Sequence, residues 1–210
     1  MSWLYFPDLF NRFYQEQSVY QILFEECQPY FEQGTVRNGQ YDERRLTCYF
    51  SLNKTPMTYS GRTIAPTLPP NFLSLLLEEI NSYEFRDKMT DFNPTLDVEF
   101  NAVFVNWYRP LNQTEKPDKL GMHSDDMTTA KSNIILSATF CQNDGIRVFN
   151  FHQNDKIVES IDLIDGSGLY MLANCQKLYK HSINDRKKNL AGQEIKGGRI
   201  NLTFRSIRDF

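Results

Sequence analysis

The chain has 210 residues, 40% of them hydrophobic, and a formal net charge of −3 at pH 7. This length predicts one domain, residues 1–210, with enough apolar side chains for a sizeable core, and the mild acidity argues against tight charge-driven binding to duplex DNA. The sequence shows no signal-peptide pattern, and no apolar run approaches the roughly 20 residues of a membrane span. We therefore expect a soluble, monomeric protein with no membrane partner.

The cysteines indicate the compartment. They are scattered along the chain, without the C-x-x-C spacing of a zinc ribbon or a redox motif. Such cysteines are typical of reduced thiols inside a cell, so we expect the protein in the cytoplasm or nucleus. The four residues are Cys27, Cys48, Cys141 and Cys175.

Helical patterns dominate the first part of the chain. Apolar residues at helical spacing after Asp8 predict a helix over residues 8–33. A hairpin or flexible loop is expected over residues 34–41, where two glycines stand, and a strand over residues 46–50. A second helix, entered through two prolines, is predicted over residues 70–82. Its apolar face consists of Leu73, Leu76, Leu77 and Ile80.

Beyond residue 97 the pattern is almost entirely strand-like. The predicted strands cover residues 98–108, 132–140, 147–151, 156–161, 168–172, 181–183 and 199–206, with a loop over residues 185–198. Helices followed by a run of strands predict an α+β fold in which the N-terminal helices buttress a sheet.

Three side chains in the strand-rich part form a candidate metal site. His123 and Asp125 are two positions apart, so on a strand they would project from the same face. His181 follows much later, and a two-sheet jelly roll would bring its strand back alongside. Two imidazoles and one carboxylate hold Fe(II) while leaving coordination positions open. An H-x-D pair alone is weak evidence, and its alternative is a hydrogen-bonded pair on the surface.

The segment 199–205 supports the interpretation of these three side chains as a metal site. Strand alternation places Arg199, Asn201, Thr203 and Arg205 on one face and apolar residues on the other. Two guanidinium groups with an amide and a hydroxyl suit a dicarboxylate. Taken alone, the same segment could be an amphipathic edge strand with solvated charges.

Together these residues resemble the AlkB branch of the 2-oxoglutarate- and Fe(II)-dependent dioxygenases in type, order and spacing. The similarity spans about residues 44–208, and its most specific motifs lie in the second half. Further matching pieces are Arg44 five residues before Tyr49, Tyr59-Ser60-Gly61 ahead of a proline-rich loop, Asn106-Trp-Tyr108, the segment 166–171 and Tyr179-Lys-His181.

The resemblance implies a double-stranded β-helix (jelly-roll) core over about residues 97–210. It also implies an N-terminal helix and loop over about residues 1–43, and a substrate-lid region with the second helix over about residues 44–95. Fe(II) would be bound by His123, Asp125 and His181. Arg199 would bind the distal carboxylate of 2-oxoglutarate, and the remaining contacts would come from Asn106, Tyr108, Asn201 and Arg205, with Thr203 in support.

The reaction implied is oxidative demethylation of alkylated bases in DNA or RNA, which consumes O2 and 2-oxoglutarate and releases formaldehyde, succinate and CO2. Tyr59 and Ser60 would lie against the base, with Arg44 and Asp126 also at the substrate. Tyr59 could instead pack in the core, and Arg44 could be a simple surface charge. Met127 departs from the family, because repair members carry an acidic residue there, and a thioether cannot offset a cationic base.

Two other functions stay open. A dioxygenase of the same fold could act on a protein side chain or a small molecule. A non-catalytic binding module with a vestigial metal site is the second alternative, although an intact ligand triad and both arginines weigh against decay.

Overall fold

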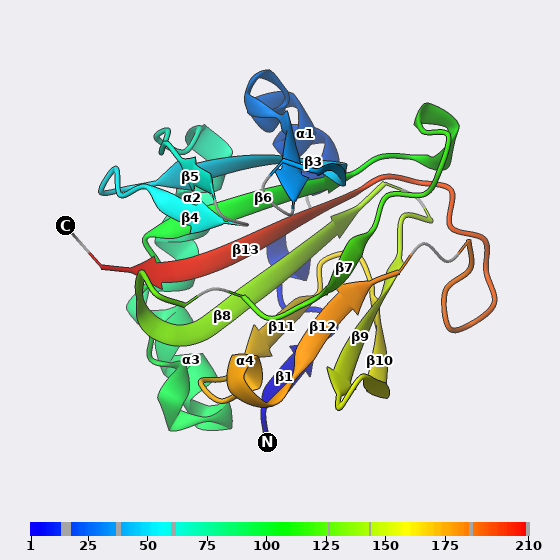
Figure 1. The fold of residues 1–210 in the computed structure, drawn as a ribbon. Coiled ribbons are helices and arrows are strands. Elements are labelled where there is room, and N and C mark those ends of the chain that lie inside the picture. The colour runs from blue at the N-terminus through cyan, green and yellow to red at the C-terminus, as the bar shows by residue number, and fades with distance from the viewer. Residues whose placement is uncertain are drawn as a thin grey trace.

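Two antiparallel sheets packed face to face form the centre of the molecule (Figure 1). The computed structural model describes residues 1–13, 18–36, 39–59, 62–125, 127–142, 144–184 and 187–208. The larger sheet has seven strands in the order β1-β11-β8-β13-β6-β3-β2, and the smaller has four in the order β10-β9-β12-β7. This is the double-stranded β-helix architecture that the sequence predicts.

The strands of the larger sheet are β1 (Trp3–Phe6), β2 (Glu32–Val36), β3 (Tyr41–Ser51), β6 (Ala102–Tyr108), β8 (Ala130–Cys141), β11 (Gly168–Met171) and β13 (Arg199–Ile207). Those of the smaller sheet are β7 (Leu120–His123), β9 (Arg147–Gln153), β10 (Lys156–Leu163) and β12 (Lys180–Ile183). A separate hairpin consists of β4 (Met57–Tyr59) and β5 (Arg62–Ile64).

The helices are α1 (Val19–Cys27), α2 (Asn71–Asn81), α3 (Tyr83–Phe92) and α4 (Cys175–Leu178), with 3-10 turns η1 (Asn11–Phe13), η2 (Gln28–Tyr30), η3 (Pro94–Leu96) and η4 (Leu111–Gln113). None of the helices in the described segments has the length and apolar character needed to cross a membrane.

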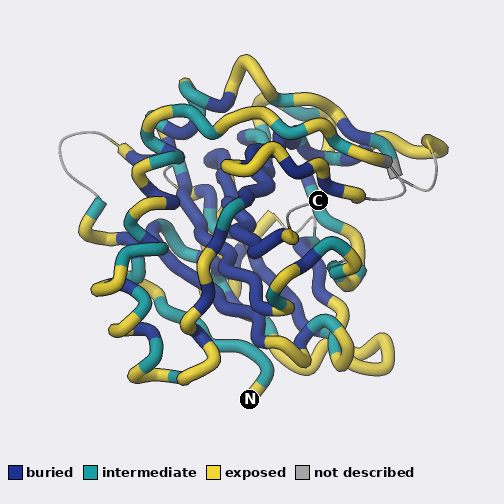
Figure 2. The backbone as a smooth tube through the Cα atoms, turned by 90° about the vertical axis from the view of Figure 1, so that its left-hand side faces the viewer, coloured by how far each residue is buried: buried dark blue, intermediate teal, exposed yellow. Residues whose placement is uncertain are grey.

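β13 lies at the centre of the larger sheet and separates two environments. Ile200, Leu202 and Phe204 point to one face, where they pack in a core shared with the helices. The intervening polar residues point to the other face, toward the smaller sheet. Strand alternation therefore assigns one face of β13 to the core and the other to the space between the sheets, as expected. Figure 2 shows the buried residues concentrated along the interior strands.

Side-chain hydrogen bonds stabilise the first turns of helices α2 and α3. The apolar face predicted for residues 70–82 is buried in α2, which confirms that helix. The carboxylate of Glu26 accepts hydrogen bonds from the backbone N–H of Phe72 at 3.0 Å and so satisfies an otherwise free donor in the first turn. At the start of α3, the Ser82 hydroxyl accepts from the Phe85 backbone at 3.1 Å, as an N-cap does.

The predicted helix over residues 8–33 is wrong in extent. Among the described residues of this range the regular helix covers only α1, and residues 32–36 form β2, which pairs with β3. Pro29 lies just beyond α1, where it cannot donate a backbone hydrogen bond. At the other end of this region, Asp8 caps no long helix, since only the short turn η1 follows it.

Two predicted strands also begin or end at other residues than expected. The strand predicted over residues 98–108 starts only at Ala102, because the Asn81 side chain holds the Phe100 backbone with hydrogen bonds of 2.7 and 2.8 Å. The strand predicted over residues 46–50 extends in both directions. The short edge strand β1 and helix α3 were not predicted at all.

Three glycines, Gly145, Gly197 and Gly198, allow two backbone segments to approach each other closely at the start of β13. A Cβ on Gly197 would lie 1.6 Å from the carbonyl oxygen of Gln142, and one on Gly145 would lie 2.1 Å from that of Gly198. Gln142 donates its backbone N–H to the Gly198 carbonyl at 2.8 Å. The β8–β9 connection and the approach to Arg199 therefore lie in direct backbone contact.

We predict that Gly197→Ala lowers the free energy of unfolding by about 1–3 kcal/mol, because the added methyl group overlaps a backbone atom. Gly121→Ala is the matched control, since nothing lies within 4 Å of the added Cβ. The control should stay within about 0.5 kcal/mol of the parent chain in denaturant unfolding. Equal stability of the two variants would contradict the close approach.

Candidate metal centre and cosubstrate pocket

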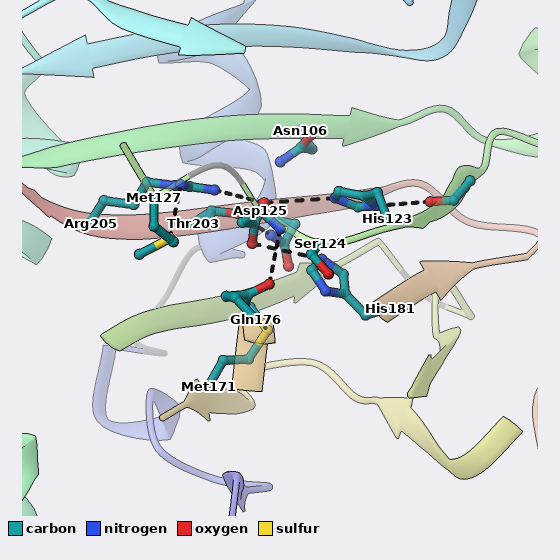
Figure 3. A network of polar contacts seen from close by, with 12 residues as sticks. Asn106, His123, Ser124, Asp125, Met127, Met171, Gln176, His181, Thr203 and Arg205 are labelled. Carbon is teal, nitrogen blue, oxygen red and sulfur yellow. Dashed lines mark hydrogen bonds and ion pairs between the residues drawn. The ribbon is translucent and has the colours of Figure 1, made fainter. Parts of the chain in front are cut away.

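His123, Asp125 and His181 come together between the two sheets, at the edge where β7 pairs with β12 (Figure 3). Their ligand atoms all lie within 4.8 Å of one another. The two histidines are register partners, and each Nε2 lies 3.7 Å from a different oxygen of Asp125. This arrangement offers two nitrogens and a carboxylate to one ion.

Asp125 reaches the site by a different route from the one predicted. β7 ends at His123, so the two side chains do not share the face of one strand. Instead, the Ser124 hydroxyl donates to the Tyr179 carbonyl at 3.0 Å, and the Asp125 backbone N–H donates to Gln176 Oε1 at 2.9 Å. These contacts with Gln176 in α4 and with Tyr179 just after it turn Asp125 inward. The predicted convergence is present, but its cause is the turn after the strand.

The surroundings of both histidines suit metal binding. Burial lowers the pKa of His181 to about 3, although the Asp125 carboxylate opposes the shift. His181 is therefore neutral at physiological pH. His123 Nδ1 lies 2.8 Å from the Gly121 carbonyl, which can only accept, so Nδ1 bears a hydrogen and Nε2 is the nitrogen directed at Asp125 and the candidate metal position.

Asp125 stays ionised despite its burial. Burial alone would raise the pKa of its carboxyl group, but the positive charge of the neighbouring Arg205 holds that pKa well below its usual range. Arg205 Nη2 lies 2.7 Å from Asp125 Oδ1. The carboxylate is thus fixed in orientation by a guanidinium at one side of the candidate site.

Arg199 fits a carboxylate that the chain itself does not supply. It is 0% exposed, and its Nη2 donates to Thr139 Oγ1 at 3.0 Å and to Asn201 Oδ1. Its Nε and Nη1 have no hydrogen-bond partner among the described residues, and Cζ lies 5.1 Å from the centre of the Tyr108 ring. A buried cation with two donor nitrogens that lack a partner among the described residues is an unfavourable arrangement unless an anion completes it.

The other polar residues of β13 form a connected row. Asn201 Nδ2 donates to Thr203 Oγ1 at 3.0 Å, and the Ser137 hydroxyl donates to Asn201 Oδ1 at 2.9 Å. Asn106 is the register partner of Asn201 and lies above the triad in Figure 3. Every residue expected at the cosubstrate therefore lies on this inner face, with Arg205 at the metal end. Their individual roles remain predictions.

The residues expected at the substrate are placed less uniformly. Arg44 donates to the Pro117 carbonyl and does not line the metal pocket. The Sδ atom of Met127 lies 3.8 Å from Arg205 Nη1, so this thioether borders the metal-side guanidinium. The side chain of Tyr59, which ends β4, and the residues Ser60 and Asp126 lie outside the described part of the chain.

Sequence reasoning missed several residues of the site. Arg45 lines the pocket in place of its neighbour, Gln176 holds Asp125, and the Phe149 ring stacks on His181 with centroids 5.2 Å apart. Side chains alternate between the two faces of a strand, so the sequence could have shown that Arg44 and Arg45 point to opposite faces of β3. Only the pairing of β3 with β6 decides which of the two faces the pocket.

We predict that His181→Ala weakens the binding of Mn(II), used as a redox-stable probe. The loss should exceed the roughly 10–100-fold that removal of an outer hydrogen-bonding partner costs, because a ligand itself is lost. Isothermal titration calorimetry measures the affinity, and circular dichroism checks that the variant is folded.

The matched control is His152→Ala. His152 Nε2 lies 2.8 Å from the Ser182 hydroxyl, and this histidine is not part of the candidate metal cluster. Its replacement should leave Mn(II) affinity unchanged. Parental affinity in His181→Ala would remove His181 from the ligand set.

Comparisons with known proteins agree with this geometry. A model of the 2OG-Fe(II) oxygenase superfamily matches residues 2–205. Protein R406 of Acanthamoeba polyphaga mimivirus is 29% identical over 194 residues, covering 90% of this chain and 87% of the viral protein. The structure of OsALKBH1 is similar with a TM-score of 0.62 and 17% identity, covering 98% of both chains.

A further similar structure is an oxidoreductase of the 2OG-Fe(II) oxygenase family from Burkholderia pseudomallei. Its TM-score is 0.58 at 10% identity, with 99% of this chain and 89% of that chain covered. These two structures show the fold, and the family model shows the chemistry. The chain belongs to the 2OG-Fe(II) oxygenase superfamily: it is a 2-oxoglutarate-dependent dioxygenase with an AlkB-like fold, and it uses Fe(II), 2-oxoglutarate and O2.

Proposed function

We propose that this dioxygenase removes methyl groups from modified bases in DNA or RNA. The observation that carries the proposal is a second cavity beside the metal pocket, large enough for an extruded base. We further propose that the enzyme works inside the cell, where its four free, buried cysteines would stay reduced.

The second cavity has a volume of about 380 Å³ and lies between β3, the chain before β2, and the β4–β5 hairpin. Its lining includes Tyr49, Thr63 and Ile64, and Phe104 is a wall of both this cavity and the metal pocket. Binding sites of roughly 300–1,000 Å³ are usual for small organic groups. Enzymes that modify a base inside a duplex need such a space, because the base must leave its stack.

The residues of the chain would divide the work as follows. His123, Asp125 and His181 hold the iron, while Arg199 and Arg205 bind the charged ends of 2-oxoglutarate through planar, bidentate groups. Phe149 and other apolar side chains around the triad limit access of water.

Bound iron supplies the oxidation, in which one oxygen atom of O2 enters succinate as 2-oxoglutarate loses CO2 and the other becomes a hydroxyl on the substrate methyl group. A hydroxymethyl group on a base nitrogen then loses formaldehyde as the nitrogen regains a proton. The chain's own contribution is to orient the reactants and exclude solvent.

The charge of the pocket favours neutral methylated bases. Asp125 is the only carboxylate among the described residues that line the metal pocket, and it is paired with Arg205. Arg45 also lines this pocket, and its charge is balanced by Glu43 at 3.1 Å. A cationic base would therefore find no unpaired carboxylate in the described lining of the metal pocket, and Glu32 is the one carboxylate in the described lining of the second cavity. Met127, where an acidic residue would have helped, lies against Arg205 instead.

A second candidate is oxidation of a protein side chain or a small molecule by the same site. The net charge of −3 favours it, because nucleic-acid enzymes usually carry a basic surface. The two candidates differ in which probe stimulates succinate formation.

We predict that Arg199→Lys raises the KM for 2-oxoglutarate by about tenfold or more, because a point charge replaces the planar fork of donors at a buried position. Arg86→Lys is the control, since Arg86 forms a surface pair with Asp97 at 3.2 Å. Succinate formation at varied 2-oxoglutarate gives both constants. An unchanged KM in Arg199→Lys would place the distal carboxylate elsewhere.

The substrate is tested with two isomeric lesions, N6-methyladenine, which is neutral, and 1-methyladenine, which is cationic. Each is placed at the same position of single- and double-stranded DNA and RNA oligonucleotides. We expect formaldehyde release with a kcat/KM at least about fivefold higher for the neutral isomer, a difference of ~1 kcal/mol.

The inactive control is His181→Ala. A preference for 1-methyladenine would contradict the charge argument while supporting base demethylation. Turnover of neither isomer, nor of the corresponding methylcytosines, would reject base demethylation. Succinate formation stimulated by peptides would then support the second candidate.

A further inference from the structure

A buried chain of polar contacts runs from β3 into the pocket wall on β6. Arg45 Nε donates to Asn106 Oδ1 at 2.7 Å, and Arg45 Nη2 lies 3.1 Å from Glu43 Oε1. The side chains of Arg45 and Glu43 are 4% and 0% exposed. We infer that Glu43 and Arg45 are positioning residues, which orient the Asn106 amide so that its Nδ2 donates to a carboxylate of 2-oxoglutarate.

The orientation of an amide is usually ambiguous, because oxygen and nitrogen have nearly the same shape. Here Arg45 removes the ambiguity. A guanidinium has five donors and no acceptor, so only the oxygen of Asn106 can face it favourably. The Nδ2 end must then point away from Arg45, and Asn106 lines the pocket on that side. An anion in the pocket meets a donor, whereas a flipped amide would present an oxygen to it.

The register of the sheet makes this contact possible. Thr47 pairs with Asn106, and Arg45 is the inward-facing residue two positions earlier in β3, from which it reaches diagonally across to Asn106. Glu43 is the next inward-facing residue and lies behind Arg45. The same alternation directs Arg44 to the opposite face, where it contacts Pro117.

Energetics point to a role beyond joining two strands. Burial of an ion pair costs much of the attraction that it gains, and apolar side chains of similar size would hold β3 to β6 at least as well. A charged pair at this wall instead fixes one orientation of a neighbouring polar group. The Glu43–Arg45 pair would therefore act on the cosubstrate only through Asn106.

The inference rests on the predicted role of Asn106 at the cosubstrate and is independent of the substrate. Its test is therefore a binding measurement on Mn(II)-loaded protein without nucleic acid. We expect Arg45→Met, which keeps the length and removes every donor, to weaken 2-oxoglutarate binding about tenfold in calorimetry. That factor matches the loss of one hydrogen bond to a charged group.

A double-mutant cycle separates positioning from direct contact. Asn106→Ala should weaken 2-oxoglutarate binding by itself, and the combined Arg45→Met and Asn106→Ala variant should bind no more weakly than Asn106→Ala alone. Fully additive losses would mean that Arg45 acts on the ligand without Asn106. That result would overturn the inference.

Arg109→Met is the control for loss of a partly buried ion pair. Arg109 binds Asp118 through two contacts of 3.0 and 2.9 Å. Its replacement should lower thermal stability but leave 2-oxoglutarate affinity unchanged.

Arg45→Lys serves if Arg45→Met does not fold, because an ammonium still balances Glu43. A mobile ammonium should hold the Asn106 amide less firmly than a guanidinium does. We therefore expect 2-oxoglutarate affinity to fall roughly threefold, which is less than the loss of one whole hydrogen bond to a charged group would cause. Parental 2-oxoglutarate affinity in a folded Arg45 variant would reject the positioning role.

Discussion

Positive charge buried along the inner face of β13 is the constraint on which the rest of the structure depends. At one end Arg205 is balanced by Asp125, which the fold delivers from the turn after β7. At the other end Arg199 is fully buried, and the described residues provide it with neutral oxygens only. The protein alone leaves this end electrostatically incomplete, and we propose that the dicarboxylate 2-oxoglutarate completes it. Binding of 2-oxoglutarate would then also contribute to the stability of the fold.

The position of this charge follows from the two faces of a single strand. Ile200, Leu202 and Phe204 anchor β13 in the helix-covered core, so the polar residues between them inherit the rigidity of that core. The candidate metal ligands come from the shorter strands of the facing sheet and from a turn. A site built in this way is organised before its ligands arrive, which reduces the entropy that binding and reaction must overcome.

Local patterns in the sequence were sufficient to predict an element and its buried face where apolar residues recur with one spacing over many residues. The face of α2 and the alternation of β13 are both of this kind, and both are found as predicted. Long-range effects were not accessible in the same way: β1 is four residues long and depends on β11, and Asp125 turns inward because α4 supplies Gln176. The choice between Arg44 and Arg45 likewise depends on how β3 pairs with β6. Each of these cases requires a partner that lies far away in the chain.

The strand order of the larger sheet has a consequence for how the chain can fold during synthesis. β13 lies between β8 and β6, yet it follows both of them in the sequence. Before it is made, β6 with β3 and β2 on one side, and β8 with β11 and β1 on the other, have no strand to join them. Each half then exposes an unpaired edge, which invites pairing with other chains. Insertion of β13 closes both edges in one step, so the strand that carries Arg199 and Arg205 is also the one that ends the aggregation-prone stage.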